Sequence, residues 1–372
     1  MRVLFVVQGE GRGHLTQAIS MEKLLRENGH EVVEVLVGKS ESRRLPGFFI
    51  RNIQAPIKHI ISPNFLPTRA NRRANLSRSF LYSLWKSPEY YESMCYINRR
   101  IRETGADLVI NFYELLTGLT YFFFRPQVPL VCIGHQYLFL HKEFQVPKKN
   151  RCSYFLMNMF TRLTSLGASR RFALSFRAMK DDDAHKLSII PPLLRQEVFE
   201  QDPVEGDYIH GYMVNSGFSE YVCRWHNEHP EVALRFFWDH WEEEPVKKVD
   251  DTLWFYQLDD REFLRQMSGC KAYASTAGFE SVCEAMYLGK PILMVPAHIE
   301  QECNAYDAVQ SGAGIVDEGF NLDKLLAFAK DFRPNPAFPL WVRSSRYIIL
   351  NELEKYTTHD CVQDMYMVEE YV

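Results

Sequence analysis

The stretch VVQGEGRGHLTQA, residues 6–18, decides the fold of the first half of the chain. It overlaps an apolar run, Met1–Val7, and places three alternating glycines directly before His14. Leu15–Asn28 then carries apolar residues at helical spacing, and Glu31–Val37 is a second apolar run. A short apolar strand, a glycine turn, a helix and another strand form the repeating unit of a parallel sheet covered on both faces.

The same alternation continues through the chain. Further strands are predicted at Asp107–Asn111 and Val128–Ile133, and the proline-containing segment Ile189–Leu194 then separates a second series. The strands predicted after it are Tyr208–Val214, Val232–Trp238, Thr252–Phe255, Ala272–Ser275 and Pro291–Val295, and the helices among them are Phe218–Asn227, Glu262–Ser268 and Phe279–Leu288.

This pattern predicts an α/β protein with two doubly wound, Rossmann-like domains that face each other across a cleft. We expect the first domain to span 1–195 and the second 196–339. Leu340–Tyr356 has a helical period, and we expect residues 340–372 to pack back on the first domain. The cleft between the domains is the default ligand site of such a fold.

Size and composition agree with this prediction. The chain has 372 residues, of which 46% are apolar and 24% charged, as in a globular protein of two domains. No apolar run approaches the roughly 20 residues of a membrane-spanning helix, and the first run is too short for a signal peptide. The eight cysteines form no CxxC pair. We therefore expect a reduced, cytoplasmic protein without a structural metal.

The charge is divided unevenly along the chain. Residues 1–199 hold 29 Lys and Arg against 16 Asp and Glu, whereas the remainder is strongly acidic. A basic half favours an anionic surface or substrate as a partner. Attraction between two oppositely charged domains explains the same asymmetry, and the sequence leaves both interpretations open.

The glycine turn permits two interpretations. A dinucleotide-binding loop requires GxGxxG with an acidic residue about 20 positions later, but here the glycines are Gly9, Gly11 and Gly13, and a histidine follows. Alternatively, the glycines let the backbone approach a ligand and place His14 at the ligand edge of the sheet. A histidine titrates near neutral pH and suits a general base, although a cap or surface role is the alternative.

A second motif lies in the other half, where residues 275–304 read STAGFESVCEAMYLGKPILMVPAHIEQECN. Small residues from Ser275 to Gly278 join a predicted strand to a helix, whose free N–H groups and positive dipole end suit a diphosphate. Glu284, one turn beyond Ser281, can accept both hydroxyls of a ribose. Glu300 and Gln301 offer groups suited to sugar hydroxyls.

At these residues the sequence resembles the inverting glycosyltransferases of the GT-B fold. It is most similar to UDP-glycosyltransferases and to the enzyme that adds N-acetylglucosamine to the peptidoglycan lipid precursor. Their donor signature contains a Trp/Gln pair, then HCGWNSxxEA, GxP and an acid–Gln–xx–Asn group. The matching residues here are Gln257, Ser275 to Ser281, Glu284, Ala285, Gly289, Pro291, Glu300, Gln301 and Asn304. The turn that ends in Gly13 and His14 resembles the same group's amino-terminal motif.

The resemblance implies a reaction. His14 takes the proton of an acceptor hydroxyl while that oxygen attacks the anomeric carbon of a nucleotide-sugar, and the configuration inverts. We expect the nucleotide-sugar to be a UDP-sugar. Helix-end N–H groups hold the leaving diphosphate without an obligatory metal or other cofactor. Glu114 is the candidate to orient His14, and His135 to line the acceptor pocket. The expected donor-binding residues are Gly11, Gly13, Gln257, Ser275, Thr276, Ala277, Gly278, Phe279, Ser281, Glu284, Glu300 and Gln301.

Two residues depart from the signature. Thr276 replaces its phosphate-contacting histidine, and Glu280 replaces its asparagine. An ionised Glu280 would repel the diphosphate unless its side chain points away.

Two segments, 69–102 and 148–171, bear on the nature of the acceptor, because arginines and lysines are mixed with aromatic residues in both. This mixture suits peripheral contact with the inner face of an anionic membrane, and the expected acceptor is then lipid-linked. The alternative for the segments is a helix packed on the core, and the alternative acceptor is a glycan. No nucleic-acid-binding module accompanies the basic residues. Asp181 to Asp183 form an acidic run that we expect in a solvated loop and not at a metal.

Three other functions fit parts of the pattern. A UDP-sugar 2-epimerase shares the fold but makes His14 less central, and a non-catalytic nucleotide-sugar binding protein retains Glu284 and Gln301 without needing His14. A dehydrogenase requires a nicotinamide loop that the glycine spacing disfavours. Hexose, N-acetylhexosamine and uronic acid donors fit the motif equally well.

Overall fold

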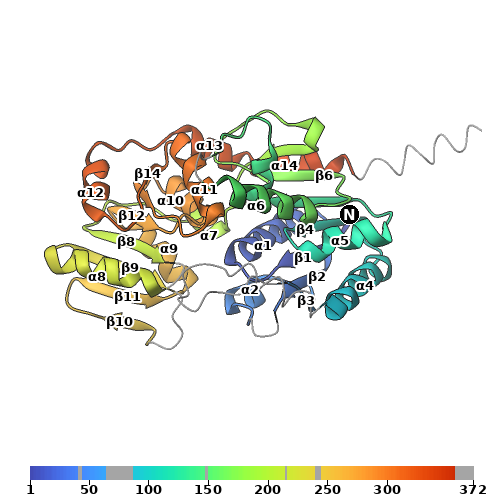
Figure 1. Cartoon of the computed structure of the whole chain (residues 1–372), viewed down its shortest axis with the longest axis horizontal. Helices are drawn as coiled ribbons and strands as arrows, with labels where there is room; N and C mark the ends of the chain where they lie inside the picture. The colour runs from blue at the N-terminus through green and yellow to red at the C-terminus, as the bar shows by residue number, and fades with distance from the viewer. Residues whose placement is uncertain (41–43, 64–86, 147–149, 214–215, 239–243, 357–372) are drawn as a thin grey trace, which may run out of the picture.

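The structure is a computed structural model that describes residues 1–40, 44–63, 87–146, 150–213, 216–238 and 244–356. It contains two seven-stranded sheets, each with helices on its faces (Figure 1). The first half of the chain forms one sheet and the second half forms the other, as the sequence predicts.

The amino-terminal sheet has the strand order β3-β2-β1-β4-β5-β6-β7, and all of its neighbouring strands are parallel. Its strands are β1 (Arg2–Gln8), β2 (Glu31–Lys39), β3 (Ile57–Ile61), β4 (Leu108–Phe112), β5 (Leu130–Gly134), β6 (Arg170–Leu174) and β7 (Leu187–Ile190). The helices of this half are α1 (Arg12–Glu27), α2 (Gly47–Asn52), α4 (Ser87–Glu103), α5 (Leu115–Phe124), α6 (Arg151–Thr164) and the short α7 (Gln196–Phe199), with 3-10 turns η1 (His135–Leu140) and η2 (Asp183–His185).

Both faces of this sheet are buried, which explains the continuous apolar runs. In β1, Phe5 packs in one core with Leu15 of α1, whereas Leu4 packs in the other core with Ile97 of α4. Because successive side chains of a strand point to opposite faces, a strand covered on both sides needs an apolar residue at every position.

The second sheet has the order β10-β11-β9-β8-β12-β13-β14 and is parallel except for the β10–β11 pair. Its strands are β8 (Tyr208–Met213), β9 (Ala233–Trp238), β10 (Val246–Lys248), β11 (Leu253–Gln257), β12 (Ala272–Ser275), β13 (Ile292–Met294) and β14 (Gly314–Val316). Its helices are α8 (Ser219–Glu228), α9 (Asp260–Ser268), α10 (Phe279–Tyr287), α11 (Ile299–Gln310) and α12 (Leu322–Asp331), preceded by the 3-10 turn η3 (Ser216–Phe218).

The final helical segment differs from its prediction. The single helix expected at Leu340–Tyr356 is two helices, α13 (Ala337–Arg343) and α14 (Ser345–Glu354), which meet at Ser344. The segment nevertheless lies against the amino-terminal sheet, where Ser188 Oγ donates to Glu352 Oε2 at 2.6 Å. Residues 357–372 of the predicted segment lie outside the described residues. The expected domain boundaries at residues 195 and 339 stay predictions.

Oppositely charged side chains join the two halves of the molecule. Arg12 of α1 pairs with Asp260 of α9 at 2.6 Å, and Arg177, after β6, pairs with Asp307 of α11. The basic first half and the acidic second half therefore meet in ion pairs. Attraction between the oppositely charged domains thus accounts for part of the charge asymmetry.

Candidate active site

The glycine turn brings the two domains into close approach. His14 lies in the first turn of α1, immediately after β1, and is buried. A Cβ added at Gly13 would stand 3.3 Å from Cγ of Glu280, in the first turn of α10. A Cβ at Gly9 would stand 2.7 Å from Cγ1 of Val37 on β2. The absence of a side chain at Gly13 therefore lets Glu280 of α10 come close to the residue before His14. The absence of a side chain at Gly9 lets the turn pack on β2.

A hydrogen bond within α1 orients the His14 ring. Gln17 lies one helical turn later, and its Oε1 is 3.2 Å from His14 Nδ1. The Gln17 Nε2 group donates to Glu280 Oε1 at 2.6 Å, and in this orientation the amide oxygen faces the ring. An amide oxygen only accepts, so His14 Nδ1 carries the hydrogen and Nε2 keeps its lone pair.

The surroundings of His14 keep it neutral. Burial lowers its pKa below 6.5, and the negative charge of Glu300 and the Gln17 hydrogen bond oppose this effect only in part. The ring also stacks on Tyr113 with centroids 5.4 Å apart. A neutral imidazole with an unprotonated Nε2 is the form that a general base requires.

Gln136 lies on the Nε2 side of the ring. Its Nε2 is 3.4 Å from His14 Nε2 and donates to Glu300 Oε1 at 2.9 Å. Gln136 belongs to η1, directly after β5, and Glu300 lies in the first turn of α11. One amide therefore connects the histidine to a carboxylate of the donor motif.

The donor motif forms a strained loop before α10. Ala277 has a φ of 59°, a left-handed conformation uncommon for a residue with a Cβ, and its N–H donates to Ser275 Oγ at 3.0 Å. Asn304 Nδ2 donates to the Ala277 carbonyl at 3.2 Å and fixes the loop from α11. No side chain caps α10 at Gly278, and the buried Thr276 Oγ1 has no hydrogen-bond partner. Helix-start N–H groups without a side-chain cap, beside an unpaired hydroxyl, suit an anionic ligand.

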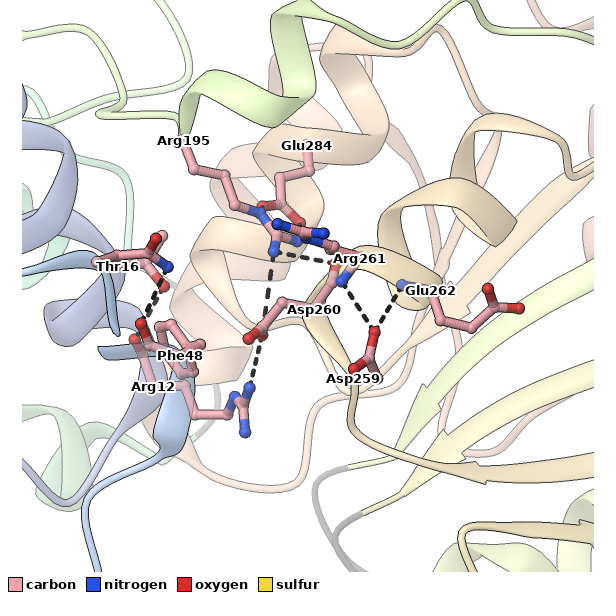
Figure 2. Close-up of polar contacts among 10 residues, drawn as sticks. Arg12, Thr16, Phe48, Arg195, Asp259, Asp260, Arg261, Glu262 and Glu284 are labelled. Atoms are coloured by element: carbon pink, nitrogen blue, oxygen red, sulfur yellow. Dashed lines mark hydrogen bonds and ion pairs between the residues drawn. The ribbon is translucent and has the colours of Figure 1, made fainter. Parts of the chain in front are cut away.

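Glu284 of α10 is already engaged (Figure 2). The Arg195 guanidinium donates from Nε to Glu284 Oε1 at 2.7 Å and from Nη2 to Oε2 at 3.2 Å. Arg195 also lies 4.0 Å from Asp260, which binds Arg12. Both carboxylate oxygens expected at a ribose thus accept from an arginine that follows β7.

The sequence profile of Glycosyl transferase family 1 matches residues 1–332. The chain belongs to this family. It is a glycosyltransferase with the GT-B fold, as the two sheets and their solved relatives show. No curated protein matches it by sequence.

Solved structures share the fold over almost the entire chain of this glycosyltransferase. UGT2 of Phytolacca americana, complexed with UDP-2fluoro-glucose and pterostilbene, has a TM-score of 0.62 at 12% identity, covering 96% of this chain and 99% of its own. Arabidopsis thaliana UGT89C1, complexed with UDP-L-rhamnose, has a TM-score of 0.59 at 14% identity, covering 95% and 97%. Acinetobacter baumannii MurG has a TM-score of 0.54 at 14% identity, covering 95% and 99%.

The structure does not bring Glu114 to His14. Glu114 is buried, accepts from Ser62 Oγ at 2.5 Å and caps α5 by accepting from the Leu116 N–H at 3.1 Å. Burial raises the pKa of Glu114 to about 7. Its position after β4 suggested the orienting role, but the side chain turns toward its own helix. Gln17 takes the place beside Nδ1, and only its helical spacing from His14 could have indicated this.

His135 lies in the domain interface. Its ring stacks on Phe279 of the donor motif with centroids 4.0 Å apart, and its Nδ1 is 2.6 Å from the Leu174 carbonyl. Burial lowers its pKa to about 3, so the ring is neutral. Sequence reasoning singled out His135 for the acceptor but passed over its neighbour Gln136, which contacts His14.

The other expected donor residues make local contacts or end a strand. Ser281 Oγ donates to the Gly278 carbonyl at 3.2 Å, and Gln301 Oε1 accepts from the Ala297 N–H at 2.8 Å. Gly11 donates its N–H to Gln8 Oε1 at 3.3 Å, and Gln257 is the last residue of β11. The Gln301 oxygen is therefore used inside its own loop.

Two sequence expectations about acidic residues need correction. Glu280 is not an anion near a diphosphate: it faces Gln17, and burial raises its pKa to about 8, so the group is neutral at pH 7. Asp182 is not solvated: it is buried and accepts from the Lys142 N–H at 3.1 Å, while its neighbours Asp181 and Asp183 pair with Arg170. Within the described ranges, no group of three His, Cys, Asp or Glu side chains is arranged to hold a metal ion.

Proposed function

We propose that this glycosyltransferase moves a hexosyl-type sugar from a UDP-sugar to a hydroxyl acceptor with inversion, and that His14 is its general base. In the proposed step the acceptor oxygen bonds to the anomeric carbon, the bond from that carbon to the diphosphate breaks, and the acceptor proton passes to His14 Nε2. The observation that carries this proposal is the buried, neutral imidazole whose unprotonated Nε2 faces Gln136 and, through it, Glu300.

The start of α10 supports the donor half of the proposal. Its uncapped N–H groups and the unpaired Thr276 hydroxyl would bind the leaving diphosphate, so that these groups take the role for which other enzymes use a metal ion. The neutral state of Glu280 removes the repulsion expected from the sequence. The two plant structures named above each contain a UDP-sugar, which supports UDP as the nucleotide of the donor.

We also propose that the acceptor is a lipid-linked molecule and that the enzyme meets an anionic membrane peripherally. Helix α6 exposes Phe155 and Met159 between the exposed Arg151 and Arg162. The end of α5, which packs beside α6, exposes Phe123. Apolar side chains flanked by arginines suit the headgroup region of a bilayer. No helix in the described part of the chain is long and apolar enough to cross a membrane.

One arginine of the other basic segment is used inside its own domain. Residues 69–86 of that segment lie outside the described residues. In the described part, Arg100 of α4 binds the buried Glu34 at 2.7 Å. This arginine therefore stabilises the fold of its own domain.

Calorimetry and a transfer assay test the proposed function together. UDP, dTDP, GDP and NADH are first titrated without added metal, and we expect UDP alone to bind tightly. His14→Ala should then lower transfer by about 10²–10⁴-fold, the usual contribution of a general base, and leave UDP affinity unchanged. His59→Ala is the matched control, because His59 is an exposed histidine on β3 of the same domain. Turnover of His14→Ala near the wild-type rate would show that the base is wrongly assigned.

A further inference from the structure

Each ring nitrogen of His14 is connected to the second domain through one glutamine. On one side, Nδ1 contacts Gln17, which donates to Glu280 of α10. On the other side, Nε2 faces Gln136, which donates to Glu300 of α11. Both glutamines belong to the amino-terminal domain and both glutamates to the carboxyl-terminal domain.

The Gln17 side of this arrangement determines the tautomer. Gln17 is buried, so water is not available to replace its amide next to Nδ1. A glutamine amide can present either its oxygen or its NH₂ group to a neighbour, and the two choices have opposite effects on the ring. Glu280 Oε1, at 2.6 Å, accepts from the NH₂ group and leaves the oxygen facing His14.

We propose that Gln17 is the positioning residue that holds His14 in its base tautomer, and that Glu280 fixes Gln17 only while the two domains are in contact. This inference rests on the proposed function of His14. It replaces the carboxylate expected from the sequence with an amide that is itself held from the opposite domain. If the domains separate, Gln17 loses its acceptor, its amide is free to turn, and the ring loses its fixed orientation.

The groups around this chain agree with a neutral, amide-based orientation. Glu280 is a half-buried residue of α10 that faces Gln17 of α1, and its charged neighbours are Glu284 and Arg195. Around His14, the charged neighbour is Glu300, and Tyr113 covers one ring face. Since Glu280 is neutral at pH 7, no negative charge stands behind Gln17 to draw a proton onto Nε2.

Substitutions at Gln17 test the proposal directly. Gln17→Leu should lower kcat about 100-fold, as expected for loss of orientation of a reacting group, with UDP affinity within twofold of wild type. Gln17→Glu restores an acceptor beside Nδ1 and should recover most of the rate. It should also move the acidic limb of the pH profile upward, because a carboxylate raises the pKa of the histidine. Gln54→Leu is the control, since Gln54 is an exposed glutamine of the same domain.

Glu280 supplies a second, independent pair of variants. Glu280→Gln keeps an oxygen that accepts from Gln17 and should retain the rate, whereas Glu280→Leu should fall as far as Gln17→Leu. The double variant Gln17→Leu/Glu280→Leu should lose no more than either single one, because the two residues act as one unit. Equal rates for Glu280→Gln and Glu280→Leu would overturn the proposal.

The tautomer of His14 can be measured directly, without a transfer assay. Nitrogen-15 NMR of the histidine ring in the whole protein should show hydrogen on Nδ1 in the wild type and a mixture of tautomers in Gln17→Leu. Glu280→Leu, which removes the acceptor that fixes the Gln17 amide, should give the same mixture and serves if Gln17→Leu does not fold. An unchanged Nδ1–H signal in Gln17→Leu contradicts the proposal. The same assays include His14→Ala: if that variant is active the proposed function fails, whereas if only Gln17→Leu stays active the orienting role alone fails.

Discussion

Arg195 and Glu284 form a buried ion pair with two contacts, Nε to Oε1 at 2.7 Å and Nη2 to Oε2 at 3.2 Å, that joins the segment after β7 to α10 (Figure 2). Arg195 further donates to the Asp260 carbonyl at 3.2 Å. One arginine thus ties the inter-domain segment both to the helix of the donor motif and to α9. This relationship has consequences for stability and for donor binding.

Removing the arginine alone should destabilise the protein. Arg195→Met leaves the Glu284 carboxylate buried without its partner, and we expect the free energy of unfolding to fall by about 3–5 kcal/mol. Arg195→Met/Glu284→Met should recover most of this loss, because no unpaired charge stays behind. Denaturant titration measures both. Arg2→Met is the control: Arg2 pairs with Glu31 on the surface, where one pair contributes about 0–1 kcal/mol. A single variant as stable as wild type would show that the pair contributes little.

Glu284 should also affect the donor. If the ribose hydroxyls bind its carboxylate, Glu284→Gln replaces a charged acceptor by a neutral one and should weaken UDP binding about tenfold, the loss of roughly 1.4 kcal/mol. Titration calorimetry with UDP measures the effect at constant pH. Unchanged affinity would mean that Glu284 serves Arg195 alone.

The half-buried carboxyl of Glu280 should make the free energy of unfolding depend on pH. Its pKa is raised from 4.5 to about 8 in the folded protein. The folded state therefore holds this proton more strongly than the unfolded chain, and the resulting stability is complete below pH 4.5 and is lost as the pH rises to about 8. The slope approaches about 1.4 kcal/mol per pH unit between these values. Glu280→Gln should remove this dependence.

The comparison is cleanest between pH 7 and 8. Glu114 has the same sign, with its pKa raised from 4.5 to about 7, so its contribution is largely lost below that range. Denaturant titrations of wild type and Glu280→Gln at both pH values isolate the Glu280 effect. Parallel stability curves for the two proteins would show that the Glu280 carboxyl is ionised in the folded state.

The exposed face of α6 should bind anionic vesicles. Phe155→Ser/Met159→Ser removes apolar side chains that are 64% and 48% exposed, so we expect several-fold weaker sedimentation with vesicles of phosphatidylcholine and phosphatidylglycerol. Leu340→Ser on α13 is the control, because Leu340 is 70% exposed and belongs to a different surface helix. Equal sedimentation of the double variant and wild type would argue against a membrane role for this face.

The strands that carry a continuous apolar run could be predicted closely. β12 (Ala272–Ser275) has the predicted bounds, and β1 begins and ends one residue later than predicted, because a strand buried on both faces requires an apolar residue at each position. The sequence does not predict β3, β6, β7, β10 and β14, which lie toward the edges of the two sheets. The break between α13 and α14 could not be seen, because Ser344 and its neighbours continue the helical period. There the packing on β7 overrides the local pattern.

The site could be predicted only where one motif contains it. His14 and the loop before α10 could be singled out because each stands within a short pattern at a strand end, and the structure brings the two patterns close together. The contact of Gln17 with Glu280 joins residues 263 positions apart, and that of Arg195 with Glu284 joins residues 89 apart. Nothing in either local stretch specifies such a partner. The position of Glu114 after β4 likewise does not specify its contacts, which are Ser62 and the start of its own helix and not His14 Nδ1.

The polypeptide passes between the two halves of the molecule twice (Figure 1). It leaves the first sheet after Ile190 and returns when Trp341, ahead of α14, donates from Nε1 to the Ser175 carbonyl at 2.9 Å. The chain therefore connects the second half to the first at two places, one after β7 and one before α14. A relative movement of the two halves has to preserve both connections, and we expect it to be a rotation about the line that joins them and not a separation.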